Sequence, residues 1–305
     1  MIPGAARTAL EEALGDQIRF GVPMARHTSL RVGGRADALA TPIDRRQLAR
    51  LLRVCAAYRL PHTTLGGGFN TLVLDGGLEG VVVQLKQLRR LEERPCGQLR
   101  AEAGVSHASL IRFCSTRGLS GLEFGAGILG TVGGWVAMNA GIPSRETKDV
   151  VEEIEVMSPS GSRLRHLPRE ALRFRYRALR GLAPGSLVVS ALLAVTLSKP
   201  ALVRAEVDRL LAQRGESQPI HVPSCGSVFR NPPGDFAGRL IEAAGLKGER
   251  QGGAQISSLH ANFIATEPDA TAADVLALIR RAQLAVERQS GIRLVPEVKI
   301  LGKPA

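Results

Sequence analysis

The longest regular stretches of this chain repeat their apolar residues at helical spacing and predict amphipathic helices. Segment 44–58 gathers three leucines and a cysteine on one face, and Pro61 follows it, so we expect a helix that ends before this proline. Ser106 is a suitable N-cap for a second helix, and Gly118 is a suitable end for it. The first half of the chain therefore carries at least two helices that bury one face each.

Shorter apolar runs predict strands between and after these helices. The expected strands are 62–65, 81–85, 151–157 and 186–197, with a turn at 158–161 leading from the third into a partner strand. The run 186–197 is the most apolar part of the chain, but Ser190 and Thr196 interrupt it. It is too short for a membrane-spanning helix and predicts a buried strand.

The pattern changes after Lys199-Pro200, and we place a domain boundary near residue 200. The elements expected beyond it are a helix over 201–214, a Pro/Gly-rich loop over 219–234, a helix capped by Asp235 and ending at Gly245, a helix from the capping box Thr271–Asp274 to about Gln289, and a closing strand over 293–300. At the other end, residues 1–20 predict a poorly constrained leader with a short helical segment and no export signal.

Composition places the chain among ordinary globular proteins. Of its 305 residues 44% are hydrophobic and 22% charged, which allows a full core and argues against disorder. The four cysteines show neither CxxC nor metal-ligand spacing, and the six histidines form no HExxH pair. We therefore expect no disulfide framework, no metal site, and a reducing, cytoplasmic location.

A net charge of +12 raises the question of nucleic-acid binding. Arginines are spread along the sequence, no basic run reaches five residues, and only 11 aromatic residues are available for base stacking. These features favour a basic surface that attracts anionic small molecules. A nucleic-acid-binding protein without catalysis remains the alternative from a different functional class.

Two glycine clusters carry the first candidate chemistry. Leu65-Gly-Gly-Gly-Phe-Asn-Thr71 follows a predicted strand, and its glycines allow backbone amides to approach a phosphate, while Asn70 and Thr71 add polar side chains. A plain tight turn is the simpler interpretation. Three consecutive glycines followed by Asn-Thr exceed what a turn requires, so we favour a phosphate-binding loop.

The second cluster spans 125–134 and continues to Gly141. Residues 125–130 match GxGxxG, but no convincing strand precedes them and no βαβ unit follows, so a Rossmann site is the less favoured interpretation. We expect instead a short helix that begins at Thr131 and turns its open amides toward a diphosphate. Two such loops suit one long dinucleotide such as FAD.

With these loops in place, the chain resembles the UDP-N-acetylenolpyruvoylglucosamine reductases of peptidoglycan precursor synthesis. The resemblance covers about residues 20–302. It rests on ordered motifs: His27-Thr-Ser-Leu-Arg-Val-Gly-Gly34, Gly66–Leu72, Gly125–Gly141, Tyr176-Arg177, Ser224-Cys-Gly-Ser-Val-Phe-Arg-Asn-Pro232, Gly252-Gly-Ala-Gln-Ile-Ser257, His260-Ala-Asn-Phe263 and Val295-Pro-Glu-Val298. The short spacing between Tyr176 and Ser224 resembles the subclass that lacks a long tyrosine-bearing insertion.

The resemblance implies an α+β fold. A two-lobed FAD-binding domain of the PCMH/vanillyl-alcohol-oxidase type would span 20–200, with lobes of about 20–85 and 86–200, and a substrate-binding α+β domain would span 201–305. It also implies FAD as cofactor, NADPH as co-substrate, a UDP-sugar substrate, and a cytoplasmic monomer that binds neither nucleic acid nor membrane. The reaction would reduce an enolpyruvyl group to give UDP-N-acetylmuramate.

The resemblance also assigns residues. The proposed cofactor-binding residues are Gly66, Gly67, Gly68, Asn70, Thr71, Gly127, Gly130, Thr131, Gly133, Gly134, Asn139 and Gly141, and the proposed substrate-binding residues are Arg230 and Asn231. The chain departs from the usual family pattern at Phe69, Leu129, Ile142-Pro143-Ser144 and Leu179.

Three residues are candidates for catalysis: Arg177, Ser227 and Glu297. Reduction of an enol ether conjugated with a carboxylate builds negative charge on that carboxylate, so the site needs a cation and a proton source. Arg177 suits the cation, and Ser227 matches the family's proton donor, with Cys225 as a local competitor because a thiol is the stronger acid. Glu297 would contact the enolate if protonated or paired with Arg177.

Two other interpretations of the function stay open at this point. Another oxidoreductase of the same FAD fold would oxidise an alcohol or a lactone, and a flavin-free relative would have no redox activity. The presence of all three candidate catalytic residues favours the reductase.

Overall fold

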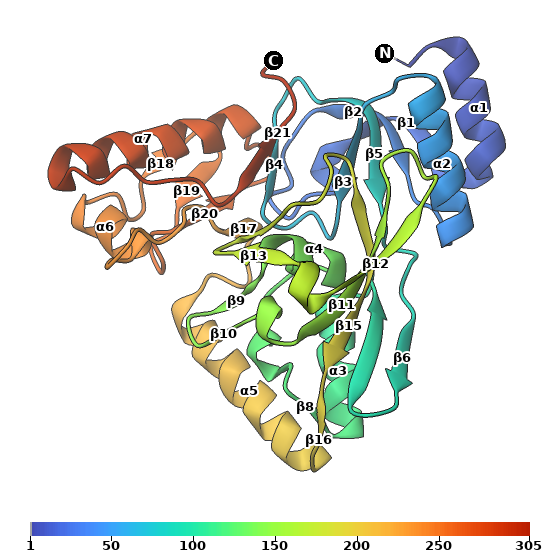
Figure 1. Ribbon diagram of the computed structural model, residues 1–305. Helices are drawn as coiled ribbons and strands as arrows, with labels where there is room; N and C mark the ends of the chain where they lie inside the picture. The colour runs from blue at the N-terminus through green and yellow to red at the C-terminus, as the bar shows by residue number, and fades with distance from the viewer. Residues whose placement is uncertain (1) are drawn as a thin grey trace. The chain divides into compact units, whose positions relative to one another are not determined.

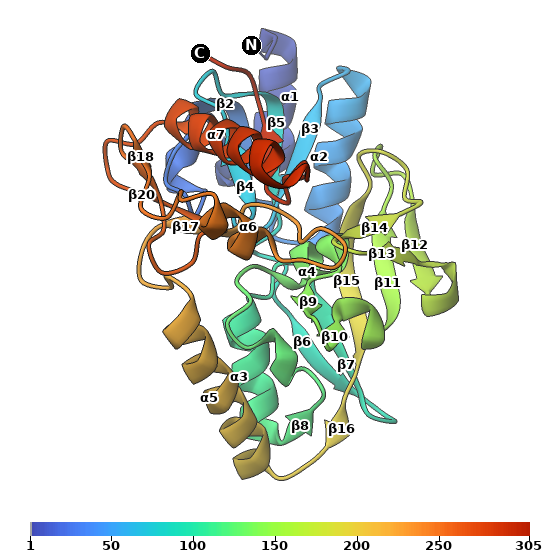
Figure 2. The ribbon, with the colours of Figure 1, turned by 90° about the vertical axis from the view of Figure 1, so that its left-hand side faces the viewer.

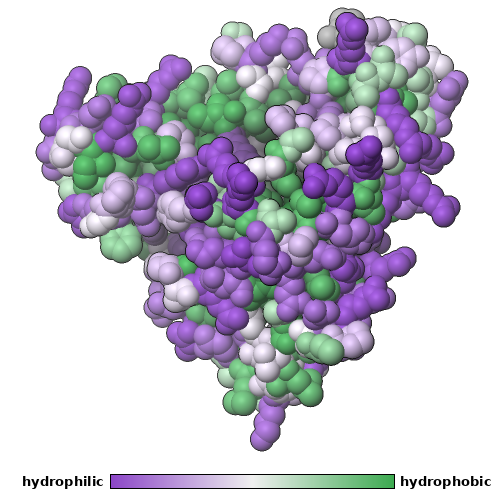
Figure 3. Space-filling view, viewed as in Figure 1, coloured by the Kyte–Doolittle hydropathy of each residue, from purple (hydrophilic) through white to green (hydrophobic). Residues whose placement is uncertain are grey.

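The computed structural model describes residues 2–305, and these form two compact units that are each built from separate pieces of the chain. The first unit contains residues 2–20, 37–67 and 79–212, and the second contains residues 21–36, 68–78 and 213–305. The two units are described one at a time. On the face of the molecule drawn in Figure 3, most residues are hydrophilic and hydrophobic ones lie among them, as expected for a chain with 22% charged residues.

The beginning of the first unit is a pair of helices packed on strands. Helices α1 (Gly4–Leu14) and α2 (Arg45–Ala57) lie side by side (Figure 1), and the four-stranded sheet has the order β1 (Ile18–Pro23), β2 (Arg35–Ala40), β5 (Leu78–Gln84), β3 (His62–Leu65). Leu10 and Leu14 of α1 join Leu48 and Leu51 of α2 in one buried cluster. The expectation of a poorly constrained leader is therefore wrong, because α1 contributes to the core.

A five-stranded antiparallel sheet forms the rest of the first unit's framework. Its order is β12 (Leu164–Pro168), β11 (Val151–Met157), β15 (Leu187–Ala194), β7 (Gln98–Glu102), β6 (Leu91–Arg94). Side chains alternate along β7, so that Leu99 and Ala101 are buried while Arg100 points to the opposite face. The apolar face packs against α3 (His107–Arg117), α4 (Val132–Met138) and the start of α5 (Pro200–Ser217).

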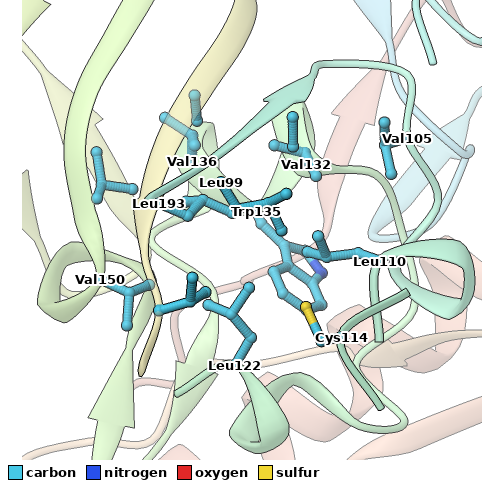
Figure 4. Packing of buried hydrophobic residues seen from close by; sticks show 14 of the residues in the cluster. Leu99, Val105, Leu110, Cys114, Leu122, Val132, Trp135, Val136, Val150 and Leu193 are labelled. Carbon is cyan, nitrogen blue, oxygen red and sulfur yellow. The ribbon is translucent and has the colours of Figure 1, made fainter. Parts of the chain in front are cut away.

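Trp135 of α4 lies within this apolar cluster. Leu99, Leu110, Cys114, Leu122 and Leu193 surround it in Figure 4. Its ring also contacts Phe124, with ring centroids 6.2 Å apart, and its indole nitrogen donates to the carbonyl of Ile128 at 3.2 Å. The tryptophan therefore fixes α4 against the glycine-containing segment before it.

The opposite face of the same sheet carries a network of ion pairs. Glu155 accepts hydrogen bonds from Ser190 and from Arg45, whose Nη2 lies 2.6 Å from the carboxylate. Arg100 bonds Glu153 at 2.8 Å and lies 3.5 Å from Glu155. Buried charge of this kind is tolerated because each carboxylate has a matched guanidinium.

Three short two-stranded pairings complete the first unit. They join β8 (Leu119–Ser120) to β16 (Thr196–Leu197), β9 (Gly141–Ile142) to β10 (Arg145–Glu146), and β13 (Arg173–Arg175) to β14 (Ala178–Arg180). The turn between β13 and β14 holds Tyr176 and Arg177. Arg177 adopts φ +54°, a left-handed conformation that lets this hairpin reverse within two residues.

The second unit is a four-stranded antiparallel sheet covered by helices. Its order is β17 (Ser224–Ser227), β20 (Phe263–Thr266), β19 (Ala254–Ile256), β18 (Arg250–Gln251), and α6 (Ala237–Ala243) and α7 (Ala272–Ser290) pack beside it (Figure 2). A parallel pair links β4 (Thr71–Val73) to β21 (Lys299–Leu301). The carboxylate of Asp75 accepts from the amides of Ala272 and Ala273, both at 2.9 Å, at the start of α7.

Most of the predicted elements are confirmed, with three exceptions in the second unit. The loop expected over 219–234 contains β17, which pairs with β20. The caps at Ser106 and Thr271 each accept a backbone amide as expected, and Asp44, which was not predicted as a cap, does the same for α2. Asp235 does not cap α6, since it bonds Phe236 and Arg239, and Asn231 accepts from Ala237 instead. The closing strand is limited to Lys299–Leu301, because residues 295–298 pair with the segment after Ser227.

Candidate active site

The first glycine loop follows β3. The glycines at its two ends, Gly66 and Gly68, are closely packed against neighbouring segments. Gly68 has φ +76°, and a Cβ there would overlap the carbonyl of His27, so only glycine fits. Its own carbonyl accepts from the amide of Ser29 at 3.0 Å. A Cβ on Gly66 would lie 2.9 Å from Oγ1 of Thr131, which is tighter than ordinary side-chain packing.

Three buried polar atoms border this loop without a protein partner among the described residues. They are Oγ of Ser29, Oδ1 of Asn70 and Oε1 of Gln84. Gln84 donates through its Nε2 to the carbonyl of Gly66 at 3.2 Å, so its amide is anchored at the loop. Ser29 and Asn70 belong to the second unit and Gln84 to the first. Buried polar atoms are costly unless they are hydrogen-bonded, so each of the three is a candidate contact for a polar ligand.

Asn70 connects the loop to the other candidate residues of the second unit. It has φ +52°, its amide donates to the carbonyl of Cys225 at 3.2 Å, and its Nδ2 donates to the carbonyl of Glu297 at 3.3 Å. Thr71 is buried in β4 and bonds the carbonyl of Phe69. Asn70 therefore has a structural role that the sequence did not reveal.

The second glycine cluster is shaped by packing around Trp135. A Cβ on Gly125 would overlap the indole ring, and a Cβ on Gly133 would lie 2.8 Å from that of Ala103. Gly127 and Gly130 have φ +75° and +134°. Gly134 has more room, since a Cβ there would lie 3.6 Å from Oγ1 of Thr131.

Thr131 stands at the N-cap of α4 as expected, but its helix does not present open amides throughout its first turn. The amide of Val132 donates to Val105 and that of Gly133 to Ala103, both at 3.0 Å. The expectation that these first amides face a diphosphate is therefore wrong. The segment between β7 and α3 accepts both amides, so they are already occupied within the protein.

Asn139 and Gly141 surround Arg177 in the first unit. Asn139 is fully buried, and its Nδ2 donates to Glu146 at 2.9 Å and to the carbonyl of Arg175 at 3.1 Å. Its Oδ1 accepts from the amide of Lys148 at 2.9 Å. All three groups of this side chain are thus satisfied within the protein.

The guanidinium of Arg177 is held at several points. Its Nη2 donates to the carbonyl of Gly141 at 3.1 Å, and its Nη1 lies 3.4 Å from Oε1 of Glu146. The Tyr176 ring lies 4.8 Å from its Cζ. Glu146 was not singled out from the sequence, and only the tertiary contacts reveal that it orients both Asn139 and Arg177.

Ser227 and Glu297 come together in the second unit. Ser227 ends β17 opposite Phe263, after a bulge at Gly226, which has φ +82°. The amide of Glu297 donates to the carbonyl of Val228 at 2.8 Å, and Phe229 bridges to Pro296. The serine and the carboxylate therefore belong to adjoining backbone segments. Arg177 belongs to the first unit.

Cys225 is a poor competitor for proton donation. Burial raises the pKa of its thiol to about 12, and the nearby charge of Glu297 acts in the same direction. A thiol with this pKa has lost the acidity that made it a candidate. Cys225 as a residue is 4% exposed, and its Sγ lies 3.8 Å from the carbonyl oxygen of Gly226.

A cavity of about 440 Å³ opens beside Ser227 within the second unit. Asn231, His260 and Asn262 line it, together with Phe236 and Arg239. Burial lowers the pKa of His260, and its Nδ1 accepts from the amide of Asn262 at 3.2 Å, so the neutral ring carries its proton on Nε2. His260 was part of a sequence motif but had received no role.

Asn262 and Arg230 fix the segment that follows Ser227. Asn262 accepts from the amide of Phe229 and donates to its carbonyl, both at 2.8 Å. The amide of Arg230 donates to Val295, and its Nε is buried with no protein partner among the described residues. That unsatisfied nitrogen fits the expectation that Arg230 contacts an anionic ligand.

Comparison with known proteins identifies both parts of the chain. Residues 36–166 match the FAD binding domain family, and residues 218–301 match the family described as UDP-N-acetylenolpyruvoylglucosamine reductase, C-terminal domain. A UDP-N-acetylenolpyruvoylglucosamine reductase of Geotalea uraniireducens is 42% identical over 97% of this chain and 98% of its own length. The chain belongs to this reductase family. The expected family, enzyme class, FAD cofactor and fold class are confirmed at that level.

Other members of the reductase family agree. The protein of the same name from Nitrosococcus oceani is 46% identical over 94% of this chain and 96% of its own length. The crystal structure of the Thermus caldophilus reductase superposes with a TM-score of 0.80 at 34% identity, covering 93% of this chain and 98% of that one. A glucose oxidase variant of Phl p 4, 14% identical with a TM-score of 0.50, shares the fold alone over 64% of this chain and 44% of its own.

No helix among residues 2–305 combines the length and apolarity needed to cross a membrane. The same residues contain no group of three or more His, Cys, Asp or Glu side chains arranged to hold a metal ion.

Proposed function

We propose that this chain reduces the enolpyruvyl group of UDP-N-acetylglucosamine enolpyruvate to give UDP-N-acetylmuramate for peptidoglycan synthesis, with NADPH as the reductant. The observation that carries the proposal is the pairing of the Ser227 and Glu297 segments in the region that matches the reductase C-terminal domain. The same proposal includes a domain division at about 200, a cytoplasmic location and a monomeric state.

FAD fits the residues that would hold it. Gly66, Gly67 and Gly68 form the first loop, in which Gly68 has a conformation that only glycine permits. Asn70 adds an unpartnered buried Oδ1, and Thr71 follows it in β4. Gly127, Gly130, Thr131, Gly133 and Gly134 form the second loop, while Asn139 and Gly141 contribute by fixing the guanidinium of Arg177. When bound, FAD supplies the hydride-transfer chemistry for both NADPH and the enol ether.

The protein's own residues then handle charge and the proton. Arg177 binds the substrate carboxylate and stabilises the negative charge that develops on it, because its guanidinium stays ionised. The Ser227 hydroxyl donates a proton to the carbon that does not receive the hydride, so that one hydride and one proton add across the double bond. Glu297 acts in protonated form or beside the cation of Arg177, and Arg230 and Asn231 bind the sugar or diphosphate.

Absorbance of the purified holoprotein tests the proposal. We expect a flavin spectrum that bleaches when NADPH is added without oxygen and returns when the enolpyruvyl substrate follows, with a product two hydrogens heavier. If an alcohol or lactone reduces the flavin instead, the chain belongs among the oxidases of this fold. If the substrate leaves the bleached protein unchanged, the proposed reaction is wrong.

A further inference from the structure

A cavity in the first unit lies outside the candidate active site and over the ion pairs of Arg45, Arg100 and Glu155 described above. It has a volume of about 1100 Å³ and lies over the polar face of the five-stranded sheet, next to the start of α2 and the loop before β6. Its lining is strongly basic, with the arginines Arg45, Arg46, Arg89, Arg90, Arg94 and Arg100. A cavity of this size holds a molecule as large as a nucleotide.

The charges on its floor cancel. Glu155 is buried and bonded to Arg45 and lies 3.5 Å from Arg100, while Glu102 lies 3.8 Å from Arg45. Burial opposes ionisation of Glu155, but hydrogen bonds from Ser190 and Arg45 outweigh it and lower its pKa. The floor therefore stays ionised and matched, and it neither attracts nor repels an anion strongly.

The charges on its rim do not cancel. Arg94 pairs with Glu92 at 2.9 Å, whereas the side chains of Arg46, Arg89 and Arg90, here called the rim arginines, have no recorded acidic partner among residues 2–305. Asp44 is the one remaining acid on the lining, and its carboxylate accepts from the amide of Gln47. The rim thus keeps a net positive charge.

Arg46 is a cation placed at the start of a helix. It occupies the second position of α2, where the helix dipole disfavours a positive charge, and the carboxylate of the N-cap Asp44 accepts from the amide of Gln47. Arg45, beside it, is compensated by Glu155, but Arg46 has no ion pair among residues 2–305. A bound anion would compensate this guanidinium. Local rules of this kind are commonly broken at functional sites.

The loop that carries Arg89 and Arg90 is rigid. Leu88 is 2% exposed, its amide donates to Leu85, and its carbonyl accepts from Gly104 at 2.8 Å. Arg90 is fixed through its own amide and carbonyl, which bond the side chain and the amide of Glu102. The two guanidinium groups are therefore presented on an ordered backbone, which lowers the entropy lost when they bind a ligand.

We propose that this cavity binds a multiply charged phosphate-bearing small molecule through Arg46, Arg89 and Arg90. Arginine recognises phosphate oxygens in a two-pronged geometry, and three such groups around one cavity suit a di- or triphosphate. A small molecule is favoured over a nucleic acid because the lining contains no Phe, Tyr or Trp side chain for base stacking, and its one aromatic ring is the imidazole of His166.

Inorganic triphosphate is the probe, titrated by calorimetry into the flavin-containing protein. The variant Arg46→Ala/Arg89→Ala/Arg90→Ala should bind at least about tenfold more weakly, since charge-assisted contacts are lost. The control Arg53→Ala/Arg163→Ala/Arg280→Ala removes the same charge from other exposed positions and should change the affinity by less than about twofold.

Equal weakening in both triple variants would mean a general effect of net charge and would overturn the proposal. So would the absence of saturable triphosphate binding to the unmodified protein, or retention of full affinity by the rim variant. A duplex oligonucleotide that binds more tightly than triphosphate, and through the same three arginines, would favour nucleic acid instead. If the triple variant does not fold, the double variant Arg89→Gln/Arg90→Gln gives the same test.

Discussion

The amide of Glu297 donates a 2.8 Å hydrogen bond to the carbonyl of Val228, the residue after Ser227. The two candidate groups are thus tied through adjacent backbone and not through their side chains. Either side chain can be replaced while this hydrogen bond is kept, which makes the two roles separable by mutation.

Ser227→Ala should leave flavin reduction by NADPH unchanged and slow reoxidation by the enolpyruvyl substrate by about 10² to 10⁴ fold, because the proton donor is missing. Stopped-flow absorbance measures the two half-reactions separately. Ser224→Ala, on the same strand, is the matched control and should affect neither. Equal losses in both half-reactions would show that Ser227 has another role.

Gly67→Val should yield a protein without bound flavin, because the added side chain crowds the loop expected to hold the diphosphate. The ratio of flavin to protein absorbance after purification measures this. Gly215→Val, in α5 and outside both glycine loops, should keep its flavin. A yellow Gly67→Val protein would contradict the placement of the cofactor.

Asn139→Gly should destabilise the protein by about 2 to 3 kcal/mol, measured by denaturant unfolding, because several hydrogen bonds are lost in a buried site. Glycine accepts the φ of +43° found here, so the change isolates the side chain. Asn139→Ala adds backbone strain and should cost more. Equal stability of Asn139→Gly and the unmodified protein would mean that these hydrogen bonds contribute nothing.

Glu155→Gln should lower the free energy of unfolding by about 1 to 3 kcal/mol near neutral pH, because Arg45 and Arg100 lose a charged partner. The pKa of Glu155 is lowered in the folded state, so its contribution is present above its ordinary pKa and is lost as the pH falls. The free energy of unfolding of the variant should therefore decrease less steeply than that of the unmodified protein as the pH falls. Glu206→Gln, in an exposed pair on α5, should change neither quantity.

Alkylation should distinguish the four cysteines. Burial raises the pKa values of Cys55 to about 11 and of Cys114 and Cys225 to about 12, whereas Cys96 is exposed. Iodoacetamide at about pH 8 should modify only Cys96 in the folded protein, since the thiolate is the reactive form. Mass spectrometry of digests should find all four modified after denaturation. Rapid native labelling of Cys225 would contradict its burial and reopen its candidacy as the proton donor.

Local signals predicted much of the fold. The helices opened by Asp44, Ser106 and Thr271 follow from capping chemistry and apolar spacing, both of which are properties of neighbouring residues. The region around Asp235 and the strand at 293–300 were predicted less well. Asn231, four residues before Asp235, accepts from the amide of Ala237 that Asp235 was expected to cap. At 293–300 a distant segment takes the hydrogen bonds, since residues 297 and 298 bond Val228.

Sequence motifs single out Ser227 and Glu297, whose catalytic roles stay predictions, and the structure pairs their backbone segments. The candidate site was not predictable where a residue acts through tertiary contacts. Glu146 contacts Asn139, seven residues away, and Arg177, which is 31 residues away in sequence. The occupied amides of Val132 and Gly133 were equally hidden, because their acceptors lie in the segment before α3.

The pairing of β4 with β21 has a consequence for biosynthesis. Residues 71–73 leave the ribosome early, yet their parallel partner is residues 299–301 at the far end of the chain. The carboxylate of Asp75 likewise lacks its hydrogen-bond donors until the first turn of α7 has been synthesised. The early strand therefore keeps this edge open until residues 299–301 have been synthesised, which makes nascent chains vulnerable to aggregation. Loss of residues 299–301 would remove far more order than these residues themselves contain.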